Sequence, residues 1–169
     1  MAHKHTAAED IVQLILEDHK PLKKLIKIMK DTDKDLEERK AAFEQFAPLL
    51  VTHAKPEEQS LYVYMKKDED TREEALEGDV EHGLADQMLE EAKRTDDEDL
   101  WTARVKVLAE LVEHHIEEEE EELLPEFKKN SEPEERRKLG HIFLRLKDKI
   151  EVEEAVQEVE DEMAAHAPH

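Results

Sequence analysis

The residues of this chain best suited to chemistry are a histidine and a glutamate in the middle of an apolar helical stripe. His115 and Glu119 are four residues apart, and side chains three or four residues apart share one face of a helix. The whole stripe consists of Trp101, Val105, Leu108, Val112, His115, Glu119, Leu123 and Phe127. Burying an imidazole and a carboxylate is costly unless both are satisfied, and a metal ion would satisfy both.

A second pair, His53 and Glu57, has the same spacing. Its apolar neighbours on that face are Phe43, Phe46, Leu50, Leu61 and Tyr64. Two further histidines stand singly in other segments. His19 shares a face with Ile11, Ile15, Leu22, Ile26 and Met29, whereas His82 lies with Ala85 and Leu89 beside a second stripe of Leu76, Val80, Leu84 and Met88. Imidazole and carboxylate ligands suit iron, manganese or zinc, and a carboxylate can bridge two cations. The pattern therefore indicates a dinuclear site in the core of a helical bundle.

Four long helices are needed to bring these side chains together. We expect the first to open at a capping box formed by Thr6 and Glu9. The second should cover about residues 36–67 with a bend at Pro56, the third about 72–95, and the fourth should begin at Asp97 or Asp99 and end near residue 130. Short polar turns between them predict an all-α fold, an up-down-up-down four-helix bundle with an additional C-terminal helix. We assign the bundle to residues 1–130, and a C-terminal helix with an acidic tail, packed on or extending the same domain, to residues 131–169.

Composition narrows the classes of partner. The net charge of -22 repels nucleic acid and anionic lipid, so we expect neither. The absence of cysteine excludes disulfides and thiolate metal sites. We see no signal peptide at the start of the chain and no apolar run of membrane-spanning length. We therefore expect a cytoplasmic protein, as a monomer or weak dimer.

Four short motifs contain the candidate ligands. They are DHKPLKKL around His19, HAKPEEQSLY with His53 and Glu57, EHGLADQML with His82, and HHIEEEEEELLP with His115 and Glu119. In order and spacing they resemble the hemerythrin family in its bacterial HHE cation-binding form. The resemblance implies two iron ions joined by an oxo or hydroxo bridge, with manganese or zinc less favoured. It also implies terminal ligands at His19, His53, His82 and His115, and bridging carboxylates at Glu57 and Glu119.

Asp86 departs from the family pattern. Oxygen-carrying hemerythrins have a further histidine four residues after the one that His82 matches. If two irons take about twelve ligand positions, the four histidines, two bridging glutamates and bridging oxygen fill about ten. Asp86 or water would complete the shell. We therefore expect a site more open to peroxide or inner-sphere redox, and less suited to reversible oxygen carriage.

The function predicted is a di-iron protein that binds dioxygen, peroxide or nitric oxide for sensing, detoxification or oxygen handling, with an unidentified electron donor. Peroxide- or oxygen-reactive enzyme activity is left open. One alternative is an iron-binding or storage module without turnover, and another is a metal-free helical interaction domain. His114 is interpreted as an edge or solvent-facing residue. Tyr64, on the face of Glu57, is a candidate hydrogen-bond donor to a bound oxygen species.

Overall fold

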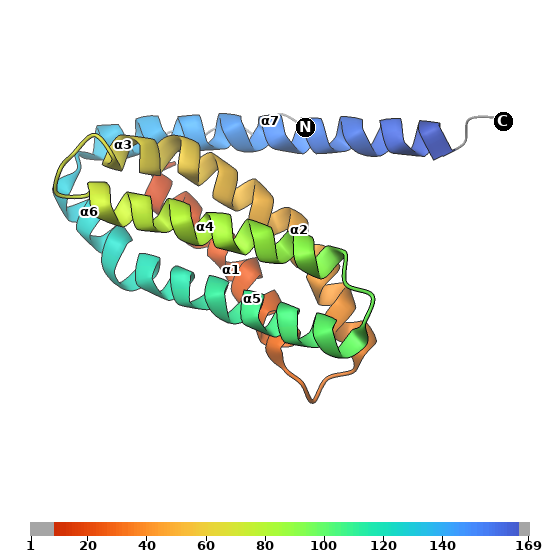
Figure 1. Ribbon diagram of the computed structural model, residues 1–169. Helices are drawn as coiled ribbons and strands as arrows, with labels where there is room; N and C mark the ends of the chain where they lie inside the picture. Colours follow the sequence, from red (N-terminus) through yellow and green to blue (C-terminus); the bar gives the residue numbers. More distant parts are fainter. Residues whose placement is uncertain (1–8, 166–169) are drawn as a thin grey trace.

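The computed structural model describes residues 9–165, and every regular element in that range is helical. Polar turns separate five long helical segments, as the sequence predicts (Figure 1). The elements are α1 (Ile11–Lys30), α2 (Leu36–Glu57), η1 (Glu58–Tyr62), α3 (Val63–Met65), α4 (Arg72–Lys93), α5 (Glu98–Glu118), η2 (Glu119–Leu123), α6 (Leu124–Asn130) and α7 (Pro133–Ala165). No helix among the described residues is long and apolar enough to cross a membrane.

The core consists of two apolar clusters with a polar layer between them. Helix α1 packs against α2 and α5, and α4 packs against α5. One cluster includes Leu22 and Val112, and the other includes Ile15 and Leu61. His19 lies between Ile15 and Leu22 along α1, so the predicted histidines enter the core where one cluster gives way to the other. Apolar packing on both sides therefore keeps this layer away from bulk water.

Two π-helical turns interrupt the ligand-bearing helices. The segment η1 begins directly after Glu57, and η2 begins at Glu119 itself. The Leu124 N–H donates to the Glu119 carbonyl, a bond one residue longer than in an α-helix, and Pro125 has no N–H to donate the next one. The bend expected at Pro56, between His53 and Glu57, is displaced, because α2 continues through Glu57 and the irregularity is a π-turn that begins at Glu58. There the Ser60 hydroxyl donates to the Pro56 carbonyl at 2.5 Å.

The helix ends refine the sequence prediction. Helix α1 is capped by Asp10, whose side chain accepts from the Val12 N–H at 2.9 Å. Thr6, of the expected Thr6–Glu9 capping box, lies outside the described residues. Of the two predicted caps for the fourth long segment, Asp97 takes the role and accepts from the Leu100 N–H at 2.8 Å.

The long C-terminal helix α7 packs on α1 and α2, and its end extends past the bundle (Figure 1). Arg136 near its start bonds Asp10 at 2.7 Å and so ties α7 to the cap of α1. Phe143 is fully buried against the same end of the core. Gly140 allows the two backbones to approach, because a Cβ there would overlap the Glu9 carbonyl.

Helix α4 presents only one of its two apolar sides to the core. Ala75, Ala85 and Leu89 are buried together with His82. The neighbouring stripe of Leu76, Val80 and Leu84 faces outward, with side chains 42%, 63% and 49% exposed. Small residues at Ala75, Gly78, Ala85 and Ala92 on the buried side let α4 approach its neighbours closely, so this side is buried although the stripe beside it has more large apolar residues.

Candidate metal centre

Six of the seven predicted ligands lie together in the polar layer. All six are buried, with exposed fractions of 7% or less. Their ligand atoms form two groups, each within 4.8 Å: Glu57, His82, His115 and Glu119 in one, and His19, His53 and Glu119 in the other. Whether these residues bind metal stays a prediction, but the structure brings them to a single place.

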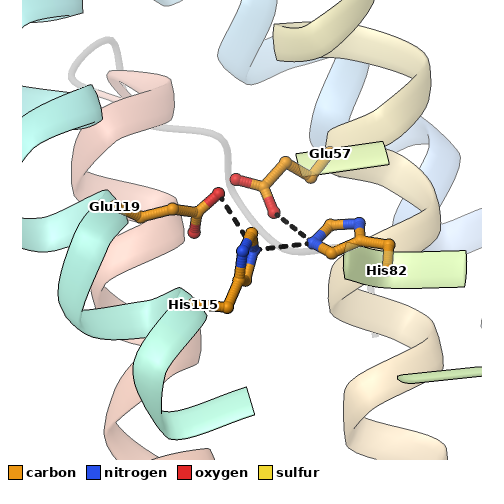
Figure 2. Close-up of side chains that lie close together, drawn as sticks. All are labelled: Glu57, His82, His115 and Glu119. Atoms are coloured by element: carbon orange, nitrogen blue, oxygen red, sulfur yellow. Dashed lines mark hydrogen bonds and ion pairs between the residues drawn. The ribbon is translucent and has the colours of Figure 1, made fainter. Parts of the chain in front are cut away.

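The first group has the spacing of ligands around one cation (Figure 2). His82 Nε2 lies 2.9 Å from His115 Nε2, and His115 Nε2 lies 3.3 Å from Glu119 Oε1. Ligands at right angles, each about 2.1 Å from one metal, are about 3 Å apart. Glu57 Oε2 is somewhat farther, 3.8 Å from His82 Nε2.

Glu119 connects the two groups through its two oxygens. Its Oε1 faces His115, whereas its Oε2 lies 3.3 Å from His19 Nε2. Glu57 also serves both sides, because its Oε2 is 3.3 Å from His53 Nε2 as well as near His82. Glu119 therefore belongs to both groups with one oxygen toward each, whereas Glu57 reaches both sides through a single oxygen.

The unsatisfied atoms of the core fit a pair of cations. Within the described residues, the buried side-chain atoms without a hydrogen-bond partner are His19 Nε2, His53 Nε2, both oxygens of Glu57, and Glu119 Oε2. All of them are potential ligand atoms at the centre of this layer. Unpaired buried polar groups are costly and rare in proteins, whereas bound cations would satisfy every one of these atoms.

Each predicted histidine ligand also contacts a carboxylate through its outer nitrogen. The Nδ1 pairs are His19 with Glu120 at 3.1 Å, His53 with Asp18 at 3.1 Å, His82 with Glu58 at 3.0 Å, and His115 with Glu81. An ionised carboxylate can only accept, so each Nδ1 donates to its outer carboxylate and each Nε2 is directed toward the centre. This is the arrangement that orients metal-bound histidines in proteins.

The charges of the outer carboxylates agree with this role. Burial by itself would raise the pKa of Asp18, Glu58 and Glu120, but hydrogen bonds from the histidines and from nearby lysines outweigh it and lower each pKa. The hydrogen bond from His115 likewise lowers the pKa of Glu81. All four groups are therefore anionic acceptors at neutral pH.

In the absence of a metal, the pKa values of the inner residues are shifted in different directions. Burial, together with the charge of Glu119, raises the pKa of Glu57 well above its usual value. Burial also opposes charge on Glu119 and His115, yet their mutual attraction lowers the pKa of Glu119 and raises that of His115. Burial and like charge thus favour the protonated form of Glu57 in the absence of a metal, whereas a bound cation would favour its anionic form.

Tyr62 is a member of the site that the sequence analysis missed. It is completely buried, and its hydroxyl donates to Glu119 Oε1 and lies 3.4 Å from His115 Nε2. The π-turn puts Tyr62, five residues after Glu57, on the ligand face. Tyr64, the tyrosine expected there from four-residue spacing, is only half-buried and packs against Phe127. The sequence signal for this shift was Pro56, because a proline inside a helix interrupts the regular pattern of backbone hydrogen bonds.

The other candidates lie apart from the two groups. Asp86 joins neither, and its carboxylate accepts from Lys55 Nζ at 2.6 Å. His114 is exposed and pairs with Glu118 at 3.1 Å, which agrees with its solvent-facing interpretation.

Comparison with known families agrees with the motifs. Residues 10–127 match the Hemerythrin HHE cation binding domain. This match spans all six clustered residues and every helix that carries them. A search of curated proteins and a search of solved structures returned no significant match.

Proposed function

Because the chain belongs to the hemerythrin HHE cation-binding family, we propose that it is a non-haem di-iron protein that binds dioxygen, peroxide or nitric oxide. The proposal includes an up-down-up-down order for the four ligand-bearing helices. A buried group able to hold a metal supports cation binding. Two ions in place of one are supported by the two groups that share Glu119, whereas the choice of iron rests on the family alone.

A small apolar cavity beside the histidines is the observation that favours a small ligand. It has a volume of about 20 Å³, enough for a molecule of one or two heavy atoms. Its walls include His53, His82 and His115. The remaining lining is mostly apolar, with two acidic residues at its edge, and consists of Leu22, Leu50, Ala54, Ala85, Leu111, Val112 and Ile116 together with Glu81 and Asp86. Such a cavity suits an uncharged diatomic molecule and excludes larger or ionic substrates.

When bound, an iron pair would supply ferrous–ferric redox chemistry and open coordination positions. The protein's own groups have distinct parts in this. Glu57 and Glu119 balance the charge of the cations, and the outer carboxylates hold the histidines in one orientation. Tyr62 donates a hydrogen bond to Glu119, which orients the carboxylate. The apolar cavity offers the histidines a mostly nonpolar neighbourhood on one side.

The decisive experiment combines metal analysis with spectroscopy. Purified protein without an affinity tag should contain about two irons per chain, with near-ultraviolet absorption that bleaches on reduction by dithionite. Stopped-flow mixing of the reduced protein with oxygen, nitric oxide or peroxide should then show which one reacts. Peroxide consumption would indicate turnover, whereas stable iron without reaction would favour storage. Protein that retains no metal after iron loading would refute the proposal.

The cavity offers a separate control. Ala85→Val narrows it without touching a predicted ligand. We expect unchanged iron content but slower reaction with the small ligand, at a cost of about 1–3 kcal/mol in folding free energy. An unchanged reaction rate would show that the ligand arrives by another path.

A further inference from the structure

A second cavity, of opposite chemistry, approaches the centre between α4 and the α5–η2 segment. Its volume is about 90 Å³. It is lined by Glu74, Glu77, Gly78, Glu81, His115, Glu118, Glu119, Glu122 and Leu123. Glu77 and Glu122 are exposed at its mouth, whereas His115 and Glu119 are buried at its floor. Six of its nine lining residues are glutamates, and none is a lysine or arginine.

The outer carboxylates elsewhere around the centre have lysine partners, whereas no lysine or arginine lines this cavity. Three of the four outer carboxylates contact a lysine: Glu120 with Lys23 at 2.7 Å, Glu58 with Lys55 at 3.6 Å, and Asp18 with Lys147. The fourth, Glu81, lies in the cavity wall, and its partner in the described part of the chain is His115. The negative charge is therefore left uncompensated on one side of the centre.

The floor of the cavity includes a buried ligand residue with an unsatisfied oxygen. Glu119 is 1% exposed, and its Oε2 has no hydrogen-bond partner among the described residues. Farther out, partial burial and the charges of Glu126, Glu122 and Glu77 raise the pKa of Glu74, as expected for crowded carboxylates without a counterion. A continuous series of carboxylates thus leads from solvent to the floor of the cavity.

We propose that this acidic cavity is the route by which divalent cations reach the buried centre, separate from the apolar cavity. A concave surface of one charge sign concentrates counterions and raises association rates. Carboxylates along the wall can replace the water ligands of an incoming cation in stages, which lowers the cost of dehydrating it in one step. The inference rests on the proposed function, because it requires that the centre binds a metal.

The test measures the rate of loading apart from the final amount of metal bound. Metal-free protein is mixed with Co²⁺ alone in a stopped-flow instrument, and its visible absorption is followed at low and high salt. The variant is Glu77→Lys with Glu122→Lys, at two exposed positions outside the predicted ligand set. The control is Glu151→Lys with Glu160→Lys on α7, which changes the net charge equally but lies away from the cavity.

We expect the cavity variant to load roughly tenfold more slowly than the control at low salt, and this difference to shrink as salt screens the charges. Both proteins should reach the same final Co²⁺ content. Equal loading rates in variant and control, or a difference that salt does not reduce, would overturn the route. Failure of the unmodified chain to bind Co²⁺ at all would instead overturn the proposed metal centre.

Discussion

Removal of one hydroxyl tests whether the π-turn, and not ordinary helical spacing, determines which tyrosine serves the centre. Tyr62→Phe deletes the donor to Glu119 Oε1 and keeps the ring in its buried position. Tyr64→Phe makes the same chemical change two residues away, at a half-buried tyrosine outside the metal-ligand groups. The two variants are therefore a matched pair.

The expected cost follows from the partner's charge. A hydrogen bond to a charged group contributes about 1.5–3 kcal/mol, and Glu119 is anionic because His115 and His19 lower its pKa. We expect Tyr62→Phe to destabilise the metal-free protein by about 2 kcal/mol, which corresponds to about 6 °C in Tm at this chain length. Tyr64→Phe should cost no more than about 0.5 kcal/mol.

Metal affinity gives a second, independent measurement. Because the Tyr62 hydroxyl orients a carboxylate shared by both groups, its loss should weaken metal binding about 10- to 100-fold in competition with a chelator. Urea denaturation and chelator competition would be measured on both variants. If the two variants have the same stability and the same metal affinity, Tyr62 has no special role and the inferred register of the site is wrong.

Three further outcomes are expected. Glu119→Gln should lower the metal content per chain measured by elemental analysis, since Glu119 belongs to both groups, whereas Glu118→Gln should retain it. In the metal-free protein, burial lowers the pKa of His53 from 6.5 to about 4. As the pH falls, His53 is therefore protonated in the unfolded chain before it is protonated in the folded protein. The free energy of unfolding is at its full value above pH 6.5 and should fall by about 3 kcal/mol as the pH drops to 4. Urea denaturation at several pH values would measure this loss. Gly140→Ala should lower Tm through overlap with a backbone carbonyl, whereas Gly83→Ala, with no atom within 4 Å, should stabilise α4 by about 0.5–1 kcal/mol.

Much of the fold and of the ligand cluster could be predicted because helical periodicity reports burial directly. All eight residues of the stripe around His115 are buried, as are the predicted faces of α1 and most of α2. Periodicity did not predict which side of α4 is buried, because two apolar stripes lie side by side on this helix. The larger residues Leu76 and Val80 face outward, because close packing selects the side with Ala75 and Ala85. Hydrophobicity alone cannot decide between two such stripes.

The position of Tyr62 on the ligand face could not be predicted from the sequence, for a different reason. Four-residue spacing assumes an unbroken α-helix, and one π-turn shifts every later residue by about a quarter turn around the axis. Pro56 indicated an irregularity, but a proline alone does not say whether the chain bends or gains a residue in its turn. The position of the hydroxyl therefore depended on a backbone detail that the sequence pattern does not encode.

The histidine partners of the outer carboxylates could not be predicted from the sequence either, and the reason is geometric. Each is the sequence neighbour of a predicted ligand: Asp18 of His19, Glu58 of Glu57, Glu81 of His82, and Glu120 of Glu119. Adjacent helical residues point about 100° apart, so each acid turns from the centre toward the next helix. There it bonds a histidine of another helix, and the four bonds form a closed ring through α1, α2, α4 and α5. Sequence reveals the adjacency, but only the relative placement of the helices decides which histidine each acid meets. Because every helix orients a ligand of its neighbour, loss of any one acid should disturb a ligand on a different helix from its own.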